Sequence, residues 1–272
     1  MRRLSVVGNI SRDRTRYPDR RGGEQLGGAA LLLSLASYRA GMEAAPVSVV
    51  GHDLRKRVLT SSLDVIDRSA LRIVDGPSAT FTLDYDGEGR LRAVDARYGV
   101  ADGGTRHALQ HIARYPDDIY HVCGRRPLDL SAVLGALDTV TADFSVDFFL
   151  PSAEEKIREA APLLPRASTI FVNSSEYRLL SRAVSLNDLP EIVVTDGPGP
   201  ARILHHGKQI ASVTPPATAS GEVTGAGDTL AGTYLANRAR GAEPLRALSE
   251  AVAAAASHIS SPPPCLPAPL RP

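Results

Sequence analysis

Cysteine is scarce in this sequence: only Cys123 and Cys265 occur among 272 residues. Their spacing matches no metal-binding pattern, and two thiols are too few for a disulfide framework. An excess of charge is also lacking, because the formal net charge is only +1, which gives no reason to expect nucleic acid as a partner. No apolar run approaches the roughly 18 residues of a membrane span. These absences favour a soluble protein with neither membrane nor nucleic acid as partner.

The first residues do not change this expectation. The apolar run before Arg12 is only a few residues long, too short for the apolar region of a secretion signal, so we expect a cytoplasmic protein. Residues 11–21 are locally basic, but Asp13 and Asp19 dilute the charge. Most of these arginines are expected on a solvated face, with phosphate contact as the alternative.

The rest of the chain alternates short apolar segments with helical patterns. Parallel strands separated by helices at this spacing favour an α/β fold with helices on both faces of a sheet. The predicted strands are 4–9, 45–51, 118–124, 142–149, 168–175 and 191–197, with two short ones in 201–215. The predicted helices are 27–41, 128–140, 152–164 and 176–184, and two that begin near 227 and 244.

Residues 78–100 do not follow this alternation. They combine β-branched and aromatic residues with a turn at 86–89, which is typical of an exposed β-hairpin. Residues 1–260 are expected to form a single domain. The tail, 261–272, is proline-rich and is expected to be extended or disordered.

The densest glycine cluster precedes a predicted helix near the C-terminus. Gly225, Ala226 and Gly227 stand directly before Asp228. Free N–H groups and the positive end of the dipole attract anions to a helix N-terminus, and glycine lets a phosphate approach the backbone closely. An anion-binding turn is therefore one interpretation. The other is an ordinary glycine-rich loop capped by Asp228.

Two common phosphate-binding patterns do not match this turn. No lysine follows the glycines, so it is not a P-loop, and Leu230 stands where the dinucleotide-binding fingerprint needs its third glycine. A nicotinamide-dependent oxidoreductase is therefore disfavoured.

With its neighbours, the turn resembles the signature of the ribokinase-like (PfkB) carbohydrate kinases, Asp-Thr-x-Gly-Ala-Gly-Asp. Glu222 and Val223 replace its first two residues. The resemblance covers roughly residues 4–260. It includes the first strand with Asp13, the paired glycines of the 27–41 helix, the Asn-x-x-Glu of 173–176 and the strand with its turn at 194–204.

The resemblance implies a three-layer α/β sandwich with a mostly parallel central sheet and a small β lid, from about 12–26 and 78–100. It implies an ATP- and Mg²⁺-dependent kinase that transfers the γ-phosphoryl group to a hydroxyl of a sugar, cyclitol or nucleoside. Asp228 would be the general base, and the backbone of Gly225, Ala226 and Gly227 the anion hole.

The remaining implied roles divide between the two substrates. The acceptor side would be formed by Asp13, Gly27, Gly28 and Leu32. The nucleotide side would be formed by Asn173, Glu176, Thr195, Gly197 and Thr224. Glu176 would hold Mg²⁺ through water, since Mg²⁺ keeps several of its waters. Leu32 replaces an asparagine that binds a sugar hydroxyl in the family, which disfavours ribose as acceptor.

Each assignment has a simpler alternative. Asp13 could be a surface charge, Asn173 could simply end a strand, and Glu176 could be a first-turn helix charge. Asp147 could approach the active site or pair locally. The 78–100 hairpin could be a lid or a homodimer contact.

Two alternatives concern larger features. His107 and His111 could share a helix face, but without a third ligand they do not favour a metal site. The replacements at Glu222 and Val223, together with the short C-terminus, leave open a non-catalytic nucleotide- or sugar-binding protein of the same fold.

Overall fold

A nine-stranded sheet forms the centre of the protein in a computed structural model that describes residues 2–19, 21–60, 63–217 and 223–260. All neighbouring strands are parallel except at one edge, where β12 runs antiparallel to both β11 and β13. Across the sheet the strands are β13 (Lys208–Val213), β12 (Gly199–His205), β11 (Glu191–Asp196), β10 (Thr169–Asn173), β9 (Phe144–Phe148), β8 (Ile119–Gly124), β1 (Leu4–Val7), β4 (Ala44–Gly51) and β5 (Leu71–Val74).

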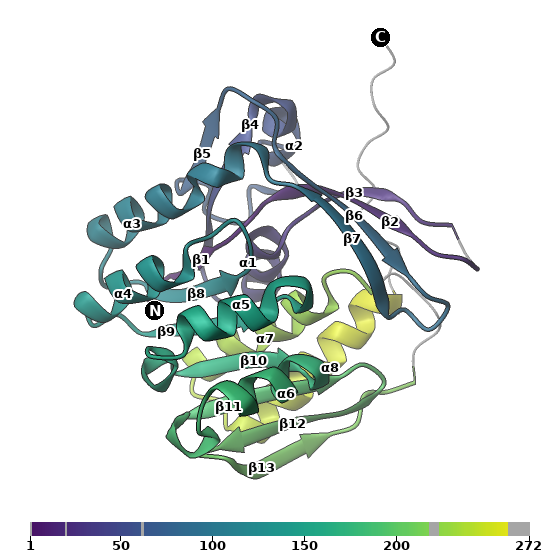
Figure 1. The fold of residues 1–272 in the computed structure, drawn as a ribbon, viewed down its shortest axis with the longest axis vertical. Helices are drawn as coiled ribbons and strands as arrows, with labels where there is room; N and C mark the ends of the chain where they lie inside the picture. The colour runs from purple at the N-terminus through teal and green to yellow at the C-terminus, as the bar shows by residue number, and fades with distance from the viewer. Residues whose placement is uncertain (1, 20, 61–62, 218–222, 261–272) are drawn as a thin grey trace.

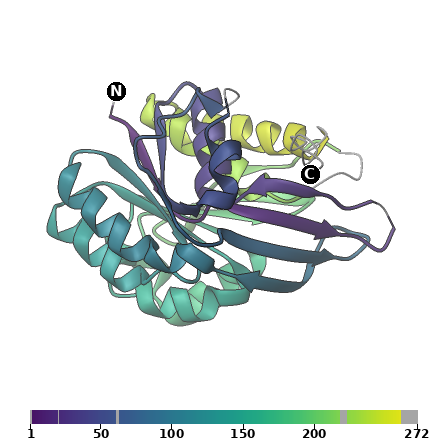
Figure 2. The same ribbon diagram turned by 90° about the horizontal axis from the view of Figure 1, so that it is seen from above.

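Helices cover both faces of this sheet (Figure 2). One layer consists of α1 (Ala29–Arg39), α7 (Ala226–Ala239) and α8 (Pro244–Ser260). The other consists of α3 (Gly104–Arg114), α4 (Leu130–Thr139), α5 (Leu150–Ala160) and α6 (Ser174–Ala183). Each layer closes its own apolar core against the sheet. Strands such as β4 are buried along their whole length because both faces are covered. The predicted three-layer α/β architecture is confirmed.

A second, four-stranded sheet projects from one end of the central sheet (Figure 1). Its order is β3 (Glu24–Gly27), β2 (Ser11–Arg16), β6 (Ala79–Tyr85) and β7 (Leu91–Arg97), and only β2 and β6 run parallel. It coincides with the two predicted lid segments. Along β2 the side chains alternate, so that Asp13 is buried while Arg14 and Arg16 are exposed.

Several short elements complete the described fold. The sequence interpretation missed α2 (Arg55–Val58), β3 and β5, because these segments are only four residues long. It considered a helix face for His107 and His111, and α3 carries both residues, but it did not include α3 among the predicted helices. The 3₁₀ turns are His52–Leu54, Gly99–Gly103, Leu164–Arg166 and Leu186–Asp188. Within the described ranges no helix is long and apolar enough to cross a membrane. The predicted proline-rich tail, 261–272, lies outside the described residues.

Candidate active site

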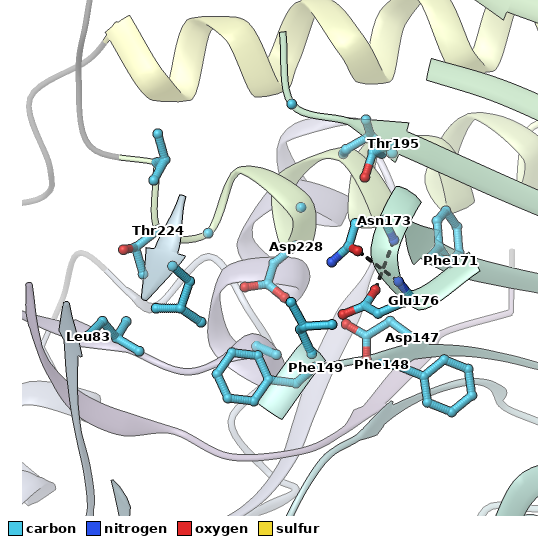
Figure 3. A pocket seen from close by; sticks show the side chains of 18 of the residues that line it. Leu83, Asp147, Phe148, Phe149, Phe171, Asn173, Glu176, Thr195, Thr224 and Asp228 are labelled. Atoms are coloured by element: carbon cyan, nitrogen blue, oxygen red, sulfur yellow. Dashed lines mark hydrogen bonds between the residues drawn. The ribbon is translucent and has the colours of Figure 1, made fainter. Parts of the chain in front are cut away.

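A cavity of about 1020 Å³ opens where the carboxyl ends of the parallel strands face the four-stranded sheet. Parallel strands end at the same edge of a sheet, and such edges collect ligand-binding residues in α/β folds. The cavity is lined by residues at or just after the carboxyl ends of β1, β8, β9, β10 and β11, by the start of α7, and by β2, β6 and β7 of the small sheet. Figure 3 shows Asp147, Asn173 and Glu176 grouped beside Asp228.

The glycine turn forms one wall of this cavity. Gly225 has a left-handed backbone (φ 86°) and is the N-cap of α7, without any side-chain cap, so Asp228 is not the capping residue. Gly227 has no atoms near its missing Cβ, whereas a Cβ on Gly225 would lie 2.6 Å from Leu32 Cδ1. Gly225, Gly227 and Asp228 line the cavity. The N–H of Ala226 instead donates to the Val223 carbonyl at 3.2 Å, and Ala226 does not line the cavity.

Asp228 stands in the first turn of α7 with its side chain only 14% exposed. Burial raises the pKa of its carboxyl, and the Asp147 carboxylate adds to that effect. The Arg125 guanidinium, 3.7 Å away, acts in the opposite direction and lowers the Asp228 pKa. Asp228 is therefore a buried carboxyl group with one arginine beside it.

Asp13 of β2 lines the cavity and is only 5% exposed, so the surface-charge interpretation is wrong. Its carboxylate accepts hydrogen bonds from the Ser11 hydroxyl at 2.6 Å and from the N–H of Gly28. Burial raises its pKa to about 6 despite these bonds. A side chain on Gly27 would overlap this carboxylate, so Gly27 leaves room for Asp13 but does not itself line the cavity.

Asn173 and Glu176 form a complete capping box at the start of α6. The side-chain oxygen Oδ1 of Asn173 accepts from the N–H groups of Ser175 and Glu176, and the Glu176 carboxylate accepts from the backbone N–H of Asn173 at 2.8 Å. Asn173 therefore does end a strand, and Glu176 is a charge in the first turn of a helix, as the simpler interpretations proposed. Both side chains also line the cavity, and burial raises the Glu176 pKa to about 8.

The remaining predicted residues line the same cavity: Gly28, Leu32, Thr195, Gly197 and Thr224. Thr224 is held from two sides. Its hydroxyl is 2.9 Å from the Tyr85 hydroxyl of β6, and its carbonyl is 2.8 Å from His258 Nε2 of α8. The small sheet thus contacts the glycine turn directly.

The sequence interpretation missed Arg125 and Tyr85 and left Asp147 open. Arg125 Nη2 donates to Asp147 Oδ2 at 2.6 Å, and both residues line the cavity, so Asp147 pairs locally and also reaches the site. One signal could have found Arg125, namely its place immediately after a strand in a parallel sheet. His107 and His111 bind elsewhere, to the Ala70 carbonyl and the Ser5 hydroxyl.

The mostly parallel sheet, the small sheet over its carboxyl edge and the glycine turn facing Asp228 and Asp13 define the ribokinase-like class. The chain belongs to the pfkB family carbohydrate kinases, whose profile matches residues 1–270. It is a phosphotransferase with an alcohol group as acceptor, a nucleoside or sugar kinase in the broad sense.

Three relatives illustrate the range of the family. A cytidine kinase from Thermococcus kodakarensis (strain ATCC BAA-918 / JCM 12380 / KOD1) is 25% identical over 88% of this chain and 89% of its own. The nucleoside kinase of Burkholderia thailandensis in complex with inosine superposes with a TM-score of 0.77 at 18% identity, covering 95% and 91%. An E. coli protein assigned as ribokinase II, solved with ATP and Mg²⁺, gives 0.76 at 17% identity, covering 97% and 94%.

Proposed function

We propose that this protein transfers the γ-phosphoryl group of ATP to a hydroxyl of a nucleoside. The observation that carries the proposal is the placement of Asp228 and Asp13 in one cavity beside the open turn of Gly225 and Gly227. Because Asp228 contributes to the raised pKa of Asp13, the two carboxylates are close enough to interact electrostatically. Asp228 is suited to take a proton, and Asp13 is suited to hold the acceptor.

In the proposed reaction Asp228 accepts the proton of the acceptor hydroxyl. The hydroxyl oxygen forms a bond to the γ-phosphorus, and the bond from that phosphorus to the bridging oxygen breaks, which releases ADP. The N–H groups of Gly225 and Gly227 would stabilise the phosphoryl oxygens. Because Ala226 donates within the turn, the anion hole is proposed to use these two glycines.

The nucleotide side is proposed around Asn173, Glu176, Thr195, Gly197 and Thr224. Oxygen donors are the ligands that Mg²⁺ prefers, and one Glu176 oxygen already accepts from the N–H of Asn173. A role for Glu176 through a metal-bound water therefore fits these residues. Bound Mg²⁺ would neutralise the charge of the phosphates.

A nucleoside fits the acceptor side because its base needs an apolar wall. Phe81 and Leu83 of β6 and Phe149 after β9 line the cavity. Aromatic side chains supply large contact areas for a flat ring. Cytidine and inosine are named for relatives of this chain, and both carry such a base.

A coupled ADP-release screen with Mg-ATP tests this proposal against nucleosides, free sugars and cyclitols. Turnover with at least one nucleoside and none with the matching free sugar supports it. Turnover with sugars or cyclitols only would contradict the nucleoside assignment and leave the kinase assignment standing. No relative of this chain described above supports a non-catalytic binding protein. Homodimer formation through the small sheet stays a prediction.

Leu32→Asn is expected to change which acceptors are used. Leu32 lines the cavity against the glycine turn and offers no hydrogen bond, so an acceptor hydroxyl buried against it loses on the order of 1–3 kcal/mol. Asparagine would supply that bond. The measurement is kcat/KM across the acceptor panel, with the KM for ATP as control. An unchanged acceptor profile would mean that Leu32 only packs.

Tyr85→Phe is expected to raise the acceptor KM by roughly 2–10-fold, because it removes one hydrogen bond between the small sheet and Thr224. Tyr38→Phe, on an exposed side chain of α1, is the matched control. Hydrogen exchange should show residues 78–100 more protected with acceptor, and less so in Tyr85→Phe. Equal protection with and without saturating acceptor would contradict the lid assignment.

A further inference from the structure

A buried guanidinium stands between two carboxylates at the end of β8. Arg125 follows Gly124, the last residue of that strand, and its side chain is only 15% exposed. Nη2 donates to Asp147 Oδ2 at 2.6 Å and lies 3.7 Å from Asp228 Oδ1. Its Cζ lies 5.4 Å from the centre of the Phe149 ring. Arg125 is therefore held in one place by an ion pair and an aromatic face.

The next residue provides a contrast within the same turn. The Arg126 side chain is 55% exposed and pairs with Glu155 of α5, outside the group around Asp228. The two adjacent arginines thus have different surroundings, and of the two only Arg125 faces the Asp228 carboxylate in the first turn of α7.

Asp228 has charged and titratable neighbours from four elements. They are Arg125 and His121 at β8, Asp147 on β9, Asp13 on β2 and His258 on α8, with Arg125 itself also facing Cys123 and Glu176. Burial lowers the pKa of His121 to about 3, so this ring is neutral. Burial raises the pKa of Cys123, so the thiol is neutral as well. His258 Nε2 is bonded to the Thr224 carbonyl.

A general base must be ionised before it can take a proton. Burial and the nearby carboxylate of Asp147 both favour the protonated form of Asp228. Arg125 is a permanent cation and opposes them. Burial alone would lower the pKa of Arg125, but the carboxylates of Asp147 and Asp228 raise it. An opposite charge within about 4–6 Å typically lowers a carboxyl pKa by roughly 1–3 units.

We propose that Arg125 is a positioning residue that keeps Asp228 ionised and oriented toward the acceptor hydroxyl, with Asp147 as its anchor. The inference rests on the proposed role of Asp228 as base. It adds a residue from the end of β8 to the site around Asp228, and it gives Asp147 a function through the arginine that it holds.

The test is a titration of Asp228 itself, which needs no turnover. Protein labelled with ¹³C at the aspartate carboxyl carbons is titrated by NMR without ligand, and the resonance missing from Asp228→Asn identifies the residue. Arg125→Met should raise the Asp228 midpoint by roughly 1–3 pH units. Arg125→Lys should restore part of the shift, and Arg126→Met should leave the midpoint within about 0.3 unit of wild type. An equally small change in Arg125→Met would overturn the inference.

The same variants are then compared in the kinase assay. The acidic limb of the profile of kcat/KM against pH should move to higher pH in Arg125→Met and stay in place in Arg126→Met. A shifted NMR midpoint in a protein that phosphorylates no acceptor would contradict the proposed function. An unshifted midpoint in an active enzyme would contradict the role of Arg125 alone.

Loss of Arg125 leaves the Asp147 carboxylate buried without its cation, which is destabilising. If Arg125→Met does not fold, the comparison moves to the Asp147→Asn background. There the Arg125→Met/Asp147→Asn protein should titrate Asp228 roughly 1–3 units higher than Asp147→Asn does. Equal midpoints in that pair would also overturn the inference.

Discussion

Asp228→Asn is expected to lower kcat by roughly 10²–10⁴-fold while the protein stays folded and binds ATP. Asparagine keeps the size of the side chain but cannot take the proton of the acceptor hydroxyl. The fold should tolerate the change, because Asp228 is not the N-cap of α7 and a buried carboxyl with a raised pKa is replaced by a neutral group. ATP affinity should be retained, since the proposed anion hole is backbone.

Asp129→Asn is the matched control for this variant. The Asp129 carboxylate accepts from the N–H of Ala132 and is a plain N-cap of α4, away from the cavity lining. Asparagine caps about as well as aspartate, so turnover should be unchanged. Measuring kcat, ATP affinity and melting temperature for both variants separates chemistry from stability. A folded Asp228→Asn protein that turns over within about threefold of wild type would contradict the catalytic assignment.

Asp13→Ala should have the second largest effect, on the acceptor alone. A hydrogen bond to a charged group contributes roughly 1.5–3 kcal/mol, so kcat/KM for the acceptor should fall by roughly 10–150-fold with little change in the KM for ATP. Asp84→Ala is the control, because Asp84 lies on β6 of the same small sheet with a side chain that is 42% exposed and pairs with Arg16.

The pH dependence gives Asp13 a second signature. Burial raises its pKa to about 6, so the carboxylate proposed to accept hydrogen bonds from the acceptor is protonated as the pH falls through that value. The acceptor KM of wild type should therefore rise below about pH 6, and Asp13→Asn should not show this rise. Equal losses for acceptor and ATP in Asp13→Ala would indicate a structural role instead of acceptor binding.

The sequence predicted the parts of the site that depend on local backbone. Gly225, Gly227 and Asp228 were found because glycine clusters and helix starts follow from adjacent residues. Asp13 and Glu176 were found through the resemblance to the family, and the buried position of Asp13 arises from alternation along β2. The cavity brings these residues together from β2 and from the starts of α6 and α7.

Contacts between distant segments could not be read from the sequence. Arg125 and Asp147 meet because β8 and β9 are neighbours in register, with Cys123 opposite Asp147. Tyr85 reaches Thr224 over 139 residues of chain. Ala226 was assigned to the anion hole, but the turn directs its N–H to the Val223 carbonyl, a detail of backbone geometry that residue types do not specify.

The most direct test of the central claim is formation of a phosphorylated nucleoside in a single turnover. Excess enzyme is mixed with Mg-ATP and a nucleoside panel, and the nucleoside monophosphate and ADP are quantified by mass spectrometry for wild type and Asp228→Asn from parallel preparations. We expect wild type to form both products in equal amounts, and Asp228→Asn to bind ATP but form them roughly 10²–10⁴-fold more slowly. A wild-type protein that binds ATP yet forms no nucleoside monophosphate, or equal rates for the two proteins, would contradict the account.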